Sequence, residues 1–178
     1  GIYKQVERVG RVCYKSEDKI TEDSAKPFVE RMVKMQHYAM LEHGTVYLAA
    51  PYNNEDLIFW KVANSPYSKG VCDDKSNLLC LTTNLRVIAE LNAWEVIDKY
   101  LCEPTESHAK RICLKFITSI GVSREFNRHR TASIAEQSTR YCNYSKEKFG
   151  GEVTFVMPSW LNFKEGSYNQ RDYYKDFY

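Results

Sequence analysis

The spacing of apolar residues differs between two parts of this chain, and that difference restricts the fold more than any other feature. In residues 21–36 (TEDSAKPFVERMVKMQ) apolar side chains recur at intervals that place them on one face of a helix, which Ser24 can cap. In residues 111–120 (RICLKFITSI) they alternate, as on one face of a β-strand. A chain of 178 residues with both patterns is expected to form one α+β domain.

Further patterns extend this expectation along the chain. Residues 44–51 (GTVYLAAP) have the character of a strand, which Pro51 stops. Residues 52–82 are rich in Pro, Gly, Asn and Asp, so loops and one short helix are expected there. Residues 82–101 are expected to be helical, in two pieces that separate near Asn92.

The last third of the chain contains residues that typically begin or end elements. Gly121 is expected to end the preceding strand, and Ser123 to cap a helix that continues into the arginines at 128–130. Residues 150–158 (GGEVTFVMP) predict a turn and another strand, and residues 162–178 predict the start of a helix.

Charge and cysteine content exclude some classes of protein. A net charge of +2 is too small for non-specific binding to nucleic acid over the whole surface. No apolar run reaches the roughly 18 residues that span a membrane, and the opening GIYKQVERVG has no secretion core, so a cytoplasmic location is expected. The six cysteines lack a C-x-x-C pair and zinc-type histidine spacing, which predicts reduced thiols and no metal site.

The stretch RHRTASIAEQSTRY, residues 128–141, concentrates hydrogen-bonding groups. Ser133 and Glu136 fit the S-x-x-E pattern of a helix capping box, and the arginines could be an ordinary solvated helix end. Guanidinium and hydroxyl donors beside one carboxylate acceptor also suit a nucleotide, because arginine matches phosphate oxygens. Arg140 adds a second guanidinium next to Ser138.

The order of these residues points to a family. Arg128, His129 and Arg130, then seven residues, then Ser138 give R-H-R-x7-S, which resembles the signature of the flavin-dependent thymidylate synthases, the ThyX family. Residues 121–158 are similar to family sequence throughout, and GRVCYKSEDKI and HYAMLEH resemble two further family segments.

The resemblance implies a fold, a reaction and an assembly. The fold is a ThyX-like mixed domain over residues 1–178, with a mainly antiparallel sheet flanked by helices. The reaction converts dUMP to dTMP, with methylenetetrahydrofolate as carbon donor, FAD as cofactor and NADPH as reductant. The assembly is a homotetramer with shared active sites, and no nucleic-acid or membrane partner is expected.

The resemblance also implies the site residues. Arg128 would lie between dUMP and the flavin, and His37 would line the flavin and folate pocket as a candidate catalytic residue. The implied FAD contacts are Arg128, His129, Arg130, Glu136 and Ala39, and the implied dUMP contacts are Glu125, Arg128, Gln137, Ser138 and Arg140.

Several features depart from the family pattern. Ala39 occupies a position where the family usually has Ser or Thr. Gln36, immediately before His37, occupies a position where the family usually has Gly. Residues 52–110 resemble the family weakly and are a candidate insertion. The sequence ends at Tyr178, whereas the family continues into a C-terminal helical part that carries its catalytic arginine. Two alternatives stay open: a truncated or degenerate member that assembles or binds nucleotide without turnover, and an RNA- or phosphate-binding module.

Overall fold

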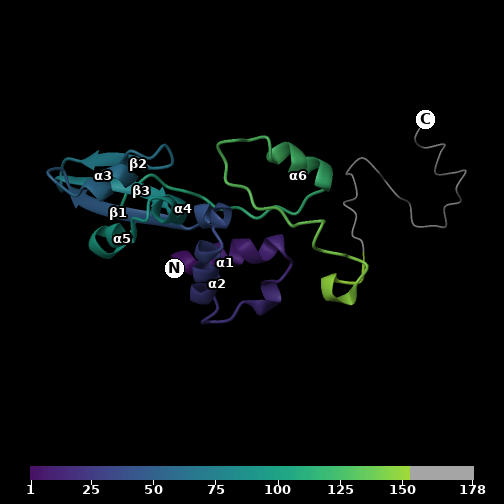
Figure 1. The fold of residues 1–178 in the computed structure, drawn as a ribbon. Helices are drawn as coiled ribbons and strands as arrows, with labels where there is room; N and C mark the ends of the chain where they lie inside the picture. The colour runs from purple at the N-terminus through teal and green to yellow at the C-terminus, as the bar shows by residue number, and fades with distance from the viewer. Residues whose placement is uncertain (153–178) are drawn as a thin grey trace, which may run out of the picture.

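The computed structural model describes residues 1–152, in which a small sheet with helices around it is followed by a long, mostly irregular segment (Figure 1). The helices are α1 (Ile2–Cys13), α2 (Ala25–Lys34), α3 (Leu57–Ala63), α4 (Leu85–Glu90), α5 (Trp94–Tyr100) and α6 (Ile120–Phe126). The strands are β1 (Thr45–Pro51), β2 (Lys69–Asp73) and β3 (Leu78–Asn84). Short 3-10 turns are η1 (Glu17–Lys19), η2 (Tyr38–His43) and η3 (Glu147–Phe149). Within this part of the chain, no helix has the length and apolar character needed to cross a membrane.

β3 forms the centre of the sheet, between β1 and β2, and both pairings are antiparallel. In β1, Val46, Leu48 and Ala50 are fully buried, whereas the residues between them are only partly covered. This alternation is typical of an antiparallel strand with one face on the core. The expected α+β class, with an antiparallel sheet flanked by helices, is confirmed.

The core lies between the sheet and the helices that follow its strands. Phe59 and Val62 of α3, Ile88 of α4 and Val96 of α5 are fully buried in one apolar cluster with β1. The α1–α2 pair joins this core through η2, whose Leu41 is also fully buried. This packing brings α1 next to η2, the turn that contains the candidate site residue Ala39.

Several local predictions are confirmed. The helix expected within residues 21–36 is α2, and the strand expected at 44–51 is β1. Most of residues 82–101 form two helices, α4 and α5, which separate at Asn92. The φ of 49° at Asn92 takes the chain out of the helical conformation there. The first three residues of that range belong to β3 instead.

Ser24 precedes α2 but does not cap it through its side chain, so that prediction is wrong. Its backbone is already helical, with φ of −75° and ψ of −21°. Its hydroxyl group donates to Glu7 Oε2 at 2.8 Å and accepts the N–H of Thr21 at 2.8 Å. Ser24 therefore links α2 to α1 rather than satisfying the first N–H groups of α2.

The sequence patterns predict neither α1 nor the β2–β3 hairpin. α3 is the short helix expected in residues 52–82, but the rest of that range contains two strands as well as loops. β2 reads KGVCD and is largely exposed, so it lacks the apolar alternation that predicts a strand. It forms because β3 offers a partner for its backbone N–H and C=O groups.

The strand predicted at residues 111–120 is absent from the structure. The segment is irregular up to its last residue, which begins α6. The alternating side chains of Ile112, Leu114 and Phe116 are 82%, 67% and 62% exposed. Alternation marks a face that can be buried, but a strand also needs a neighbour to pair its backbone. In residues 1–152 no strand pairs with this segment.

The predicted boundaries around α6 are also wrong. Gly121 lies inside the helix, and the cap is Ser119, not Ser123: the Ser119 hydroxyl oxygen accepts the N–H of Val122 at 3.5 Å. The helix ends at Phe126 and is followed by a turn. It therefore does not continue into the arginines at 128–130.

The turn predicted at the start of residues 150–158 is confirmed. Gly150 and Gly151 have φ values of 106° and 69°, a conformation that side chains with a Cβ rarely adopt. The strand predicted after this turn and the helix predicted at 162–178 lie outside the described residues.

Candidate functional site

Residues 128–140 do not form a helix, and their first half lies at the surface. The side chains of Arg128, His129 and Arg130 are exposed. Arg128 Nη1 lies 3.2 Å from Glu125 Oε2, but the two side chains are 77% and 67% exposed, so this ion pair contributes little to stability. Their charges remain accessible to a ligand.

The predicted capping box of Ser133 and Glu136 is wrong, because no helix begins at Ser133. The Glu136 carboxylate instead accepts hydrogen bonds from Ser123 Oγ at 2.5 Å and Asn127 Nδ2 at 2.9 Å. These contacts hold the segment against the middle of α6 and the residue that follows the helix. Glu136 therefore organises the loop that carries the arginines.

The second half of this segment docks on the C-terminal end of α1. The Ser138 N–H donates to the carbonyl oxygen of Cys13 at 2.9 Å. The Tyr141 ring packs on Tyr14, with centroids 5.6 Å apart and a tilt of 55°. Gln137 Nε2 is buried and has no hydrogen-bond partner in the described residues. A buried amide N–H without an acceptor is costly, and the described residues supply no acceptor for Gln137 Nε2.

A pocket of about 390 Å³ lies where α1 meets η2. Its walls include two of the predicted site residues, His37 and Ala39, together with Tyr14 and Tyr38. The methyl group of Ala39 cannot form the hydrogen bond that a Ser or Thr hydroxyl would offer there. The cavity volume falls in the range of small-molecule sites, and its aromatic walls suit a planar ring.

Arg86 of α4 lines the same pocket but is not free. Its Nε lies 2.7 Å from Glu90 Oε1, and its Nη1 is paired with Glu42. The hydrogen bond to Glu90, followed by that to Glu42, raises the pKa of Arg86, which keeps it charged. This network fixes α4 against η2 and leaves Arg86 as a wall of the pocket.

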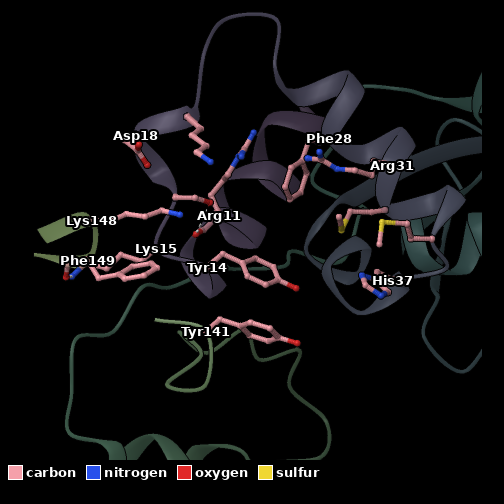
Figure 2. A pocket seen from close by; sticks show the side chains of 14 residues that line it. Arg11, Tyr14, Lys15, Asp18, Phe28, Arg31, His37, Tyr141, Lys148 and Phe149 are labelled. Carbon is pink, nitrogen blue, oxygen red and sulfur yellow. Dashed lines mark hydrogen bonds between the residues drawn. The ribbon is translucent and has the colours of Figure 1, made fainter. Parts of the chain in front are cut away.

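His37 also lines a second, adjacent pocket, which contains Tyr14 and Tyr141 (Figure 2). The two predicted groups of site residues therefore approach one another at α1: His37 and Ala39 line the pockets beside it, and Ser138 donates its backbone N–H to Cys13. Within residues 1–152 their side chains do not meet in either of these pockets, since none of residues 125–140 lines them.

Sequence reasoning missed Tyr14 and Tyr141 as wall residues and Arg86 as a pocket residue. Tyr14 lies in GRVCYKSEDKI, a stretch with no local feature beyond its resemblance to the family. The role of Tyr14 depends on tertiary structure, because its ring packs against Tyr141, a residue far along the chain.

The cysteines are free thiols, as expected from their spacing. Burial raises the pKa of the Cys13 thiol, whose Sγ lies 3.7 Å from Met40 Sδ, so it stays protonated and contributes to packing. Burial lowers the pKa of His43, whose Nδ1 lies 3.7 Å from Cys113 Sγ. Residues 1–152 contain no group of three or more side chains arranged to hold a metal ion.

A family model described as thymidylate synthase complementing protein matches residues 76–178. The match covers more than half of the chain and includes the R-H-R-x7-S pattern. It also includes residues 76–110, part of the segment expected as an insertion. No curated protein and no solved structure matches the chain significantly.

Proposed function

The chain belongs to the thymidylate synthase complementing protein family, and from this premise we propose that it catalyses the FAD-dependent reductive methylation of dUMP to dTMP. Methylenetetrahydrofolate donates the carbon and NADPH is the reductant. The observation that carries the proposal is the R-H-R-x7-S pattern of Arg128, His129, Arg130 and Ser138, which lies within the matched residues.

The free donors of residues 125–140 fit a pyrimidine monophosphate. Arg140 is exposed and makes no ion pair within the described part of the chain, so its guanidinium is available to phosphate oxygens. The unsatisfied Nε2 of Gln137 can donate to a ring carbonyl, and the Ser138 hydroxyl can donate to phosphate. We assign dUMP binding to Gln137, Ser138 and Arg140, with Glu125 and Arg128 beside them.

The remaining donors fit the flavin nucleotide. Arg128, His129 and Arg130 place three potential cations in succession, which suits the pyrophosphate of FAD, while Glu136 fixes their loop. Ala39 and His37 offer an aromatic-walled pocket for a planar ring. When bound, the flavin supplies the hydride chemistry, and the protein positions the ligands and excludes water. His37 is assigned a positioning role beside the folate, because it lines both pockets.

The proposed site is completed in a homotetramer. Within residues 1–152 of one chain the arginines face solvent and do not line the pocket of His37, which supports a site that a neighbouring chain completes. Ile112, Leu114 and Ile117 are 82%, 67% and 89% exposed, and such a concentration of apolar surface is typical of a protein interface. This surface is adjacent in sequence to the motif, which supports assembly at the site.

The decisive experiment combines cofactor content with turnover. The purified chain is expected to bind FAD, with absorbance near about 370 and 450 nm, and to form dTMP when all co-substrates are supplied. Arg130→Ala should lose FAD, whereas Arg8→Ala, an exposed arginine of α1 outside both pockets, should retain it.

Each other outcome has a distinct meaning. A chain that takes up FAD and dUMP without forming dTMP would be a family member that binds nucleotides without turnover. A colourless chain that does not take up FAD, but binds RNA with a steep dependence on salt, would overturn the proposal in favour of a phosphate-binding module.

A further inference from the structure

A pocket separate from the arginine motif lies between the α1–α2 pair and the segment that contains Tyr141 and η3 (Figure 2). Its cavity volume is about 450 Å³, which is enough for a small aromatic ligand. Residues 125–140, which carry all the proposed dUMP contacts, do not line it. Its only residue from the proposed site is His37.

The wall of this pocket is strongly basic. Among the described residues, the cationic side chains that line it are Arg11, Lys15, Lys19, Arg31 and Lys148, and Asp18 is the single lining carboxylate. Glu7 also offsets part of the charge, because its Oε1 lies 2.9 Å from Arg11 Nη2. Five cations less two carboxylates leave three positive charges from the described residues around this cavity. A chain whose total formal charge is +2 thus concentrates positive charge here.

Two of these cations have a structural role. Arg11 is held by Glu7 through Nε and Nη2, at 3.1 and 2.9 Å from Oε1. The Lys15 ammonium donates to the carbonyl oxygen of Phe149 and lies 5.2 Å from the centre of the Tyr144 ring. Lys15 therefore ties η3 to the end of α1 and closes one side of the pocket.

The other three cations are available. Lys19, Arg31 and Lys148 are exposed, and none of them makes an ion pair with another described residue. Arg31 Cζ lies 5.7 Å from the centre of the Phe28 ring, and Lys148 Nζ lies 5.4 Å from that of Phe149. Aromatic faces thus hold two of the charges at the cavity without neutralising them.

The remaining walls are aromatic. Tyr14 and Tyr141 pack at a centroid distance of 5.6 Å, and Phe28 and Phe149 lie beside Arg31 and Lys148. Flat rings offer stacking surface to a planar ligand, and the surrounding cations attract negative charge. An apolar ligand would use none of these three exposed charges, so it fits less well.

We propose that this pocket binds a planar aromatic ligand that carries two or more negative charges. Arg31 and Lys148 bind the anionic groups, and the Tyr14–Tyr141 pair contacts the ring. Two sources of this chemistry occur among the ligands of the proposed function: nucleotide phosphate, from dUMP or FAD, and the glutamate carboxylates of the folate. Only this choice of sources rests on the proposed function. The proposal that the pocket binds an anionic aromatic ligand rests on its lining residues alone.

The test uses pyranine, a fluorescent planar pyrene with three sulfonates, titrated against the full chain. Arg31→Ala/Lys148→Ala should weaken pyranine binding by at least about tenfold, because two charge-assisted contacts are lost. Lys26→Ala/Lys146→Ala is the matched control: it removes the same charge from α2 and from the segment before η3, at exposed residues outside the pocket. Equal thermal melting of both variants would show that folding is intact.

Competition then identifies the source of the ligand. If dUMP or FAD displaces pyranine, and this displacement is lost in Arg31→Ala/Lys148→Ala, the bound group is phosphate. If 5-formyltetrahydrofolate displaces pyranine, and its diglutamyl form does so more strongly, the bound group is carboxylate. Equal affinity of both double variants for pyranine, or no binding to the unmodified chain, would overturn the pocket proposal. Pyranine binding that depends on Arg31 and Lys148 in a chain that binds no flavin or dUMP would retain this proposal and reject the proposed function.

Discussion

Glu7 offers the sharpest test of how α1 is held to α2. Its side chain is 1% exposed, and its Oε1 accepts hydrogen bonds from Arg11 Nε at 3.1 Å and Nη2 at 2.9 Å. Its Oε2 accepts a third from Ser24 Oγ at 2.8 Å. Glu7→Ala removes these acceptors and leaves the Arg11 guanidinium, only 14% exposed, without a counter-charge. We expect Glu7→Ala to be among the most destabilising changes in α1.

The magnitude follows from these contacts. Removing one partner of a buried ion pair typically costs about 3–5 kcal/mol, and the partial exposure of Arg11 places this pair at the lower end, about 3 kcal/mol. For a chain of this size each kcal/mol lowers the melting temperature by about 2–4 °C, so a decrease of about 6–12 °C is expected.

Urea denaturation, followed by circular dichroism, measures this change directly. Glu7→Gln should cost less than Glu7→Ala, because its amide oxygen can still accept one hydrogen bond. Glu22→Ala, at an exposed residue without an ion pair among those described, is the control and should change stability by less than about 0.5 kcal/mol. A loss below about 1 kcal/mol for Glu7→Ala would refute the view that this buried carboxylate joins the two helices.

Three further outcomes are expected. Arg140→Ala should weaken dUMP at least about tenfold more than FAD, and Arg130→Ala should do the reverse, in calorimetric titrations; equal losses would contradict the assignment of separate ligands. Gly10→Ala should destabilise by about 1–3 kcal/mol in urea, because its Cβ would lie 2.6 Å from Phe28 Cζ. Burial lowers the pKa of His43 in the folded chain from its ordinary value of 6.5. Below pH 6.5 the unfolded chain therefore binds more protons at His43 than the folded chain does. The contribution of His43 to the free energy of unfolding should be constant above pH 6.5 and decrease as the pH falls through the folded pKa. His43→Gln should remove this dependence in urea titrations, and an unchanged slope would contradict it.

Sequence patterns predicted a strand correctly where the segment also has a neighbouring strand with which to pair. β1 has one apolar face and a partner in β3, so alternation was a sufficient guide. Residues 111–120 alternate equally well, yet they have no pairing partner among residues 1–152 and are irregular up to α6. β2 presents the opposite case, because a weak pattern becomes a strand beside β3. Strand pairing depends on two segments, so the pattern of one segment alone cannot predict it.

The candidate site divides in the same way. Residue types and their order identified Arg128–Arg130 and Ser138 as nucleotide-binding candidates, because guanidinium and hydroxyl chemistry is local. The position of Ser138 against Cys13, and of Tyr141 against Tyr14, depends on the fold. No interval in the sequence reports those contacts.

The bond between the Lys15 ammonium and the Phe149 carbonyl joins residues that are 134 positions apart. The basic pocket thus closes only when two distant segments meet, and holding them together costs loop-closure entropy that the few contacts of η3 must offset. Amide hydrogens around Phe149 should therefore exchange with solvent far sooner than those of β3. A ligand that bridges both walls would slow that exchange, so occupancy of this pocket and order in the distal segment would rise and fall together.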